Sequence, residues 1–152
     1  MPKVFTILLG LVICSFAIAQ SDNPKYDKHL ADSLGADAYG MKMYILVIIK
    51  TGSTRIDDKK KVDSILRGHL QNIMRLANLG KLVVAGPLFE NEKNYEGIFI
   101  LNVATTEDAN ALLETDPAII AGLFNTELYK WYGSAALPEF LQYHQRIQKT
   151  QF

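Results

Sequence analysis

The sequence predicts an α+β fold, with strands and helices in the order strand, helix, strand, strand, helix, strand, then a C-terminal helix. Three observations predict it. Runs rich in β-branched and aromatic residues recur four times between residues 41 and 132. Two longer segments between these runs carry apolar residues at helical spacing. Gly and Pro stand where most of these elements should end.

The first strand is expected at residues 41–50, "MKMYILVIIK", which is apolar on both faces and typical of the middle of a sheet. Thr51, Gly52 and Ser53 then interrupt it. The first long helix is expected at residues 58–79, with Gly80 as the residue that stops it. Its apolar residues fall three and four positions apart and form one stripe: Val62, Ile65, Leu66, Ile73, Leu76 and Ala77.

The remaining elements complete the predicted sheet. "KLVVAGP" (81–87) is the second strand, and "GIFILNV" (97–103) is the third. A second helix opens at residues 105–108 with a capping residue and acidic side chains, and must change direction at Asp116-Pro117. "ELYKWY" (127–132) is the fourth strand, and a last helix starts at Pro138. This order is that of the ferredoxin-like plan, a four-stranded antiparallel sheet with both helices on one face.

The other face of the sheet lacks a predicted cover. Ile45, Val47 and Ile49 alternate with a second apolar set, Tyr44, Leu46 and Ile48. Monomers rarely expose a large apolar patch. We therefore expect a homodimer in which two sheets close face to face as a dimeric α/β barrel.

The N-terminus has the pattern of a secretory signal peptide. Lys3 precedes an apolar run from Val4 to Ala19 that ends in a small-x-small motif, which predicts cleavage near Ala19 and a secreted, periplasmic protein. An uncleaved anchor is the alternative. We expect the domains to be residues 1–19, the signal; 20–40, an N-terminal extension with a helix over residues 24–34 capped by Asn23; 41–133, the ferredoxin-like domain; and 134–152, the C-terminal helix.

Composition excludes several classes of function. The chain has 16 basic and 16 acidic residues, so loss of Lys3 leaves 15 − 16 = −1, which argues against nucleic acid as a partner. The single cysteine, Cys14, lies in the signal. The mature chain therefore has no disulfide or thiolate metal site, and we expect no metal, no cofactor and no stable membrane insertion after cleavage.

His69 occupies a position on the apolar stripe where the pattern favours Leu. It is either a core histidine bonded to a backbone carbonyl, or a general base or acid in a pocket. The preceding Gly68 costs about 1 kcal/mol relative to Ala inside a helix, which makes sense if another segment approaches the backbone there or if the helix bends.

Asp116 has an ordinary interpretation as an N-cap, because it precedes a proline that starts a helical turn. A carboxylate near His69 would also hold the ring's tautomer, but the sequence does not fix whether the two residues meet. Gly86 and Pro87 end a strand, either as a plain turn or as a kink that lines a cavity.

These features in order resemble the YciI-like (YCII-related) family. The resemblance covers about residues 42–131 and depends on "HLQNIMRLANLGKLVVAGPL", "GIFILNV" and "TTEDANALLETDPAIIAGL". It implies a ferredoxin-like dimer and an active site on the family's His and Asp, which fall on His69 and Asp116. A few relatives are dehydrochlorinases of chlorinated hydroxyhydroquinones. The signal and the extension depart from the usual small cytosolic member.

Two functional hypotheses follow, both with a small-molecule partner. The first is a cofactor-free lyase, isomerase or dehydrochlorinase-like enzyme that transfers a proton on a small cyclic or aromatic metabolite. His69 would be the base or acid, Asp116 would orient it or stabilise its charge, and Gly86 and Pro87 would shape the pocket wall. The second is a non-catalytic binding or interaction module. A monooxygenase is a third hypothesis, supported by fold analogy alone.

Overall fold

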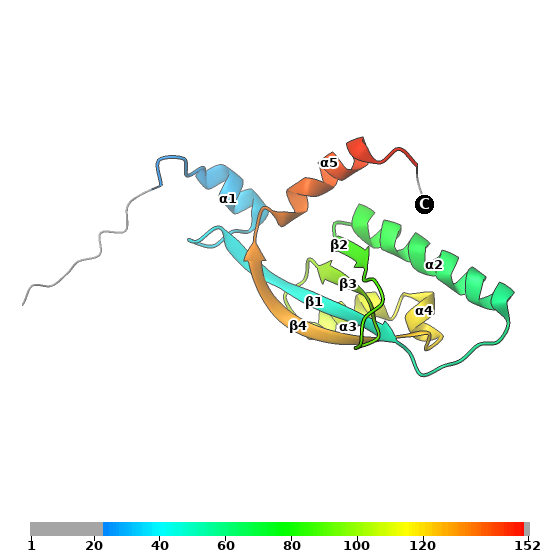
Figure 1. The fold of residues 1–152 in the computed structure, drawn as a ribbon. Coiled ribbons are helices and arrows are strands. Elements are labelled where there is room, and N and C mark those ends of the chain that lie inside the picture. The colour runs from blue at the N-terminus through cyan, green and yellow to red at the C-terminus, as the bar shows by residue number, and fades with distance from the viewer. Residues whose placement is uncertain (1–22, 151–152) are drawn as a thin grey trace, which may run out of the picture.

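The computed structural model describes residues 23–150, and the predicted signal at 1–19 lies outside them. Figure 1 shows an antiparallel sheet with helices packed against it and a short helix at each end of the chain. In chain order the elements are α1 (Lys28–Leu34), β1 (Met41–Thr51), α2 (Lys59–Asn78), β2 (Leu82–Pro87), β3 (Tyr95–Leu101), α3 (Thr106–Leu113), α4 (Pro117–Ile120), β4 (Phe124–Ser134), a 3-10 turn (Leu137–Glu139) and α5 (Phe140–Ile147).

The four strands form one antiparallel sheet in the order β2-β3-β1-β4. β1 and β4 pair along their whole length, from Met41 opposite Ser134 to Thr51 opposite Phe124. The α+β class and the ferredoxin-like arrangement predicted from the sequence are therefore confirmed.

The core lies between one face of the sheet and helices α2, α3 and α4. Alternate residues of β1 point into it, and each aliphatic side chain buried there contributes about 1.5–3 kcal/mol. The buried members of this cluster are Ile45, Val47, Ile49, Leu76, Leu82, Phe99, Leu101, Ala109 and Leu113. The packing of this core thus fixes the distance of α2 and of the α3–α4 connection from the sheet.

The long helix begins and ends as the sequence predicts. The Asp58 carboxylate caps α2 by accepting from the backbone N–H groups of Lys60 and Lys61. Gly80 follows with φ +65°, a left-handed conformation that glycine adopts without a steric cost. Within residues 23–150, no helix combines the length and apolar character that crossing a membrane requires.

The bounds of several predicted elements were wrong, including the start of the last helix, which lies at Phe140 and not at Pro138. The N-terminal helix starts at Lys28 and not at residue 24, because Asp27 caps it while Asn23 accepts from the Lys25 N–H in a preceding turn. The third strand spans Tyr95–Leu101 and not 97–103, since its pairing with β1 extends to Tyr95.

The fourth strand spans Phe124–Ser134 and not 127–132, because β1 offers it a partner at every residue. In both strands cross-strand pairing extended the element beyond the local pattern.

The second face of the sheet is apolar in its centre. Its half-buried residues are Leu46, Ile48, Val84, Ile98 and Ile100, and we call this set the outer patch. At one end Trp131 packs on buried Tyr44, with ring centroids 5.6 Å apart. At the other end Lys50 pairs with Glu127 at 2.7 Å.

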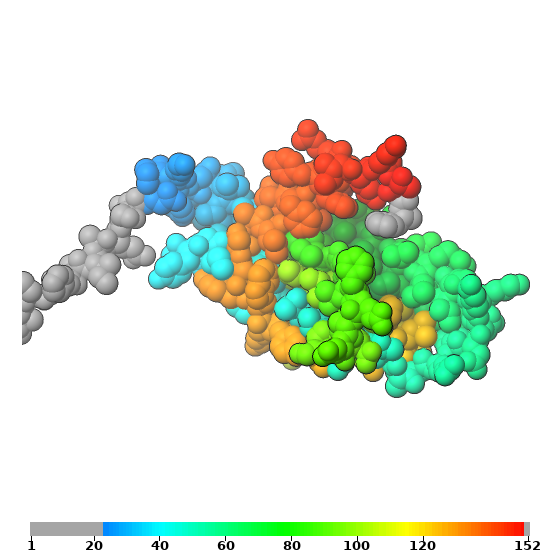
Figure 2. Space-filling model, viewed as in Figure 1, coloured from blue at the N-terminus to red at the C-terminus, as the bar shows by residue number. Residues whose placement is uncertain are grey.

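The N-terminal extension projects from the body at the end of the sheet where β4 leads into α5 (Figures 1 and 2). The hydroxyl of Tyr132 on β4 donates to the carboxylate of Asp37, which also accepts from the N–H groups of Tyr39 and Met41. The hydrogen bonds from the Tyr132 hydroxyl and the Met41 N–H lower the pKa of the Asp37 carboxyl. The extension is thereby fastened to the sheet by a charge-assisted hydrogen bond.

Candidate functional site

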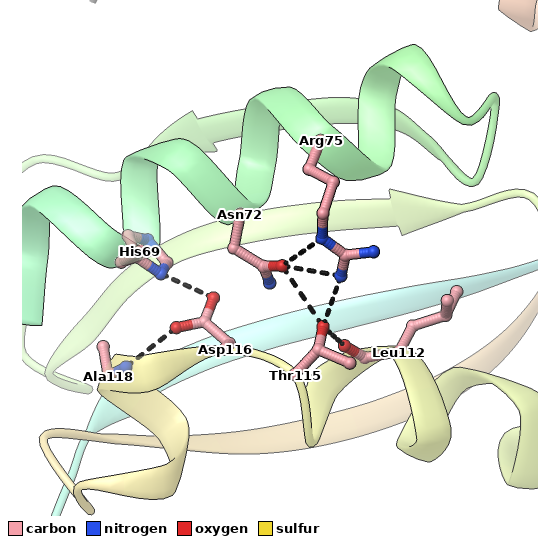
Figure 3. A network of polar contacts seen from close by, with 7 residues as sticks. All are labelled: His69, Asn72, Arg75, Leu112, Thr115, Asp116 and Ala118. Atoms are coloured by element: carbon pink, nitrogen blue, oxygen red, sulfur yellow. Dashed lines mark hydrogen bonds and ion pairs between the residues drawn. The ribbon is translucent and has the colours of Figure 1, made fainter.

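The His69 ring lies in the middle of α2 and faces the α3–α4 connection (Figure 3). Its Nδ1 atom lies 2.7 Å from Oδ2 of Asp116. An ionised carboxylate only accepts hydrogen bonds, so Nδ1 carries the proton and donates it. The structure brings together the two residues whose contact the sequence left open.

Asp116 has two roles in one side chain. Its Oδ1 accepts from the backbone N–H of Ala118 at 2.9 Å and so caps α4, as the Asp-Pro pattern predicts. Its Oδ2 is left for His69, and the carboxyl is buried, with 1% of the side chain exposed. Because both oxygens are engaged, the carboxylate has one defined orientation.

Gly68 allows the start of α4 to lie close to α2. A Cβ atom built on Gly68 would lie 3.0 Å from Cγ of Pro117, so the proline ring occupies the space that a side chain would need. This contact is the close approach to the backbone that the mid-helix glycine predicts. It brings the first residue of α4 against α2, one position from His69.

Two aromatic side chains from the sheet flank the imidazole. Phe99 of β3 stacks with it at 6.0 Å between centroids, and Phe124 of β4 meets it edge-on at 5.2 Å. The ring is mostly enclosed, with 12% of the side chain exposed. Low polarity around the ring strengthens its interaction with the carboxylate.

The second ring nitrogen, Nε2, is the one left open to solvent. In the described part of the chain, every fully buried side-chain nitrogen or oxygen has a hydrogen-bond partner. The His69 ring bonds there through Nδ1. Nε2 therefore keeps contact with solvent and, in the neutral ring, presents a lone pair.

Gly86 and Pro87 lie on β2, opposite Ile98 and Gly97 of β3. They take no part in the His69–Asp116 contact. A Cβ atom on Gly97 would lie 2.7 Å from the Gly86 carbonyl oxygen, so these strands run unusually close. Gly97 is two residues from Phe99, which places the end of β2 at the same end of the sheet as the imidazole.

Two hollows lie away from His69. One, of about 340 Å³, is lined by α1, residues 34–40, Ala135 and Ala136. The other, of about 290 Å³, is lined by Leu88 and the loop to Glu96. His29 and His144 are exposed, and within residues 23–150 no three His, Cys, Asp or Glu side chains are grouped to hold a metal ion. Neither of these two hollows is lined by His69 or Asp116.

The sequence analysis missed a second polar network beside the pair. Asn72, one helical turn from His69, is 7% exposed, and its Oδ1 accepts from Arg75 and lies 3.2 Å from Oγ1 of Thr115 (Figure 3). One signal could have revealed it, since Asn72 is a polar residue on the buried side of α2. Phe99 and Phe124 were also missed as flanking groups, because their apolar character fits a core residue equally well.

Comparison with known proteins places the chain in a family. A family model described as "YCII-related domain" matches residues 41–132. Among curated proteins, none matches the chain.

One similar solved structure is 5-chloro-2-hydroxyhydroquinone dehydrochlorinase from Burkholderia phenoliruptrix AC1100, in complex with 2,5-dihydroxybenzoquinone. It is 20% identical, with a TM-score of 0.43, over 57% of this chain and 92% of that one. The family match covers more than half of the sequence, including His69, Asp116 and the four strands up to residue 132 of β4. This chain belongs to the YCII-related domain family.

Proposed function

We propose that this protein is a secreted, cofactor-free enzyme that transfers a proton on a small cyclic or aromatic metabolite. One observation carries the proposal: Nδ1 of His69 lies 2.7 Å from the buried carboxylate of Asp116, while Nε2 keeps contact with solvent. A neutral imidazole protonated at Nδ1 is a general base near neutral pH.

The reaction follows from the geometry. Nε2 takes a proton from a C–H or O–H group of the substrate, and the imidazolium that forms is stabilised by Asp116. In an isomerisation the proton returns to another substrate atom. In an elimination, including dehydrochlorination, the electron pair expels the leaving group and the proton passes to solvent. Such a base contributes about 10²–10⁴-fold to the rate.

The substrate class is supported by the surroundings of the ring. Phe99 and Phe124 flank the imidazole, and aromatic side chains favour flat, apolar ligands. Gly86 and Pro87 would form the wall at the end of β2, next to Gly97 of β3.

We also propose a homodimer that closes over the outer patch, and export by the segment at residues 1–19. The apolar alternation along β1 and β3 supports the dimer. The cationic, apolar and small-residue order of the N-terminus supports export.

The enzyme is tested by following hydrogen–deuterium exchange in D₂O with chlorinated hydroquinones, hydroxybenzoquinones and cyclic enones. A working base should replace a substrate hydrogen with deuterium even where no net product accumulates. His69→Gln should abolish this exchange. The exposed His144→Gln is the matched control and should retain it.

The competing hypothesis, a binding module, makes a different prediction. Compounds would bind, as seen by saturation-transfer NMR, without exchange or turnover in the wild type. Binding that persists in His69→Gln, with no exchange by either protein, would overturn the proposed role of His69.

A further inference from the structure

Three consecutive residues, two from the α3–α4 connection and the first of α4, each meet α2. Thr115 lies 3.2 Å from Oδ1 of Asn72, Asp116 bonds to His69, and Pro117 packs against Gly68. The His69–Asp116 pair therefore has one contact on either side of it, and Figure 3 shows the one at Thr115.

The contact at Thr115 is a closed network. The Thr115 hydroxyl donates to the Leu112 carbonyl at 2.6 Å and lies 3.2 Å from Oδ1 of Asn72. The Arg75 guanidinium reaches both side chains, with Nη2 2.7 Å from Oδ1 of Asn72 and 2.7 Å from Oγ1 of Thr115. Its Nε adds a bond to Asn72 at 3.1 Å.

The contacts in this network restrict the side chains that make them. The Asn72 oxygen accepts from two nitrogens of Arg75 on the buried side of α2, so its loss would leave polar groups without partners. The guanidinium fork is planar and reaches two acceptors with a fixed geometry, which a lysine cannot copy. The network thus fixes the backbone at Thr115, the residue directly before Asp116.

We propose that Asn72, Arg75 and Thr115 are positioning residues that set the distance and angle between the Asp116 carboxylate and the His69 ring. The inference rests on the proposed function for its purpose, but the positioning itself is a property of the folded protein. Without the network, the contact of Pro117 with Gly68 and the His69–Asp116 bond itself would remain, and the backbone before Asp116 could shift relative to α2.

The test is NMR of the His69 ring in full-length mature protein labelled with ¹⁵N-histidine. The chain has three histidines, so His69→Gln assigns the signal by its loss. Two quantities are measured for the neutral form of the ring: the fraction of rings protonated at Nδ1, and the solvent-exchange rate of that proton.

Thr115→Val keeps the shape of the side chain and removes its hydroxyl. We expect the exchange rate to rise roughly three- to tenfold, the factor for weakening one side-chain hydrogen bond, with a lower Nδ1-protonated fraction. Thr115→Ser should restore both values. Arg75→Lys, which keeps the charge but not the fork, should change them in the same direction as Thr115→Val.

The matched control is Thr105→Val, which removes the cap at the other end of α3. It should lower the melting temperature without changing the His69 signal. If Thr115→Val and Thr105→Val both destabilise the fold and neither changes the ring, the network is structural only and the proposal is wrong. Because this readout needs no substrate, failure to find turnover would count against the proposed function and not against the positioning role.

Discussion

His69 donates from Nδ1 to Oδ2 of Asp116 across 2.7 Å, which joins the middle of one helix to the cap of another. The bond links residues that are 47 positions apart in the chain. Only the packing of α2 against the α3–α4 connection can bring them together. The pair is thus both a tertiary contact of the fold and the candidate base with its orienting carboxylate.

The effects of substituting His69 and Asp116 on the free energy of unfolding should be coupled. Asp116→Ala removes a helix cap and leaves the Nδ1–H without a partner, so we expect a loss of about 2–4 kcal/mol in the free energy of unfolding. A double-mutant cycle with His69→Ala, measured by urea unfolding, should give a coupling energy of roughly 1–3 kcal/mol. Additive effects would show that the bond contributes nothing.

Activity should depend on the charge of Asp116. Asp116→Asn can keep the cap oxygen, but its amide nitrogen can donate to Nδ1 and favour the wrong tautomer. Once a substrate is found, we expect kcat/KM to fall about 10²–10⁴-fold in this variant. A variant of Asp63, an exposed residue of α2, serves as the control for a lost carboxylate and should stay near the wild-type rate.

Gly68→Ala should fail to stabilise α2. Replacing a mid-helix glycine with alanine gains about 1 kcal/mol where nothing opposes it. Here the new Cβ atom would lie 3.0 Å from Pro117, so we expect a net loss on thermal unfolding. In a Pro117→Ala background the same change should become neutral or stabilising, because the proline ring is gone. A gain in the wild-type background would contradict the close contact.

The link between the extension and the sheet should be sensitive to acid. The pKa of Asp37 is lowered in the folded protein by the Tyr132 hydroxyl and the Met41 N–H. A depressed carboxyl pKa adds stability above its ordinary value of 3.8, and that stability is lost as the pH falls through the folded value. Tyr132→Phe should therefore be less stable than wild type at neutral pH, and the gap should shrink below pH 3.8.

Urea unfolding across a pH series measures this gap, and Tyr39→Phe, in a neighbouring exposed tyrosine, is the control. A gap that does not vary with pH would mean that the Asp37 charge is not involved.

A charge in the outer patch should prevent self-association. Ile98→Lys places an ammonium group in the middle of the apolar face, where a face-to-face dimer would have to bury it. Sedimentation velocity should then give a monomer where the wild type gives a dimer. Leu79→Lys, at an exposed leucine after α2, should leave the dimer intact. A wild type that sediments as a monomer at all concentrations would refute the assembly.

The fold was largely predictable because its local signals agree with one another. Asp58, Gly80, Thr105 and Asp116 each cap or stop a helix where the sequence places a boundary. The strand ends were less predictable, because pairing partners from elsewhere in the chain extend β3 back to Tyr95 and β4 back to Phe124.

The site was predictable in its two central residues and not in their surroundings. His69 stands out because it is a polar residue on an apolar helix stripe. Asp116 stands out because it precedes a proline that starts a helical turn. Phe99 and Phe124 give no such signal. The Asn72–Thr115 contact depends on the angle between two helices, which a one-dimensional pattern does not contain.

The residues of the candidate site come from two different parts of the fold. The imidazole and its carboxylate partner come from α2 and the α3–α4 connection, whereas Phe99, Phe124, Gly86 and Pro87 come from strands of the sheet. Gly86 and Pro87 take no part in the His69–Asp116 contact, so substitutions there can accumulate over evolutionary time without disturbing that pair. Under the proposed function, a lineage of this architecture can therefore inherit its chemistry and change what it acts on.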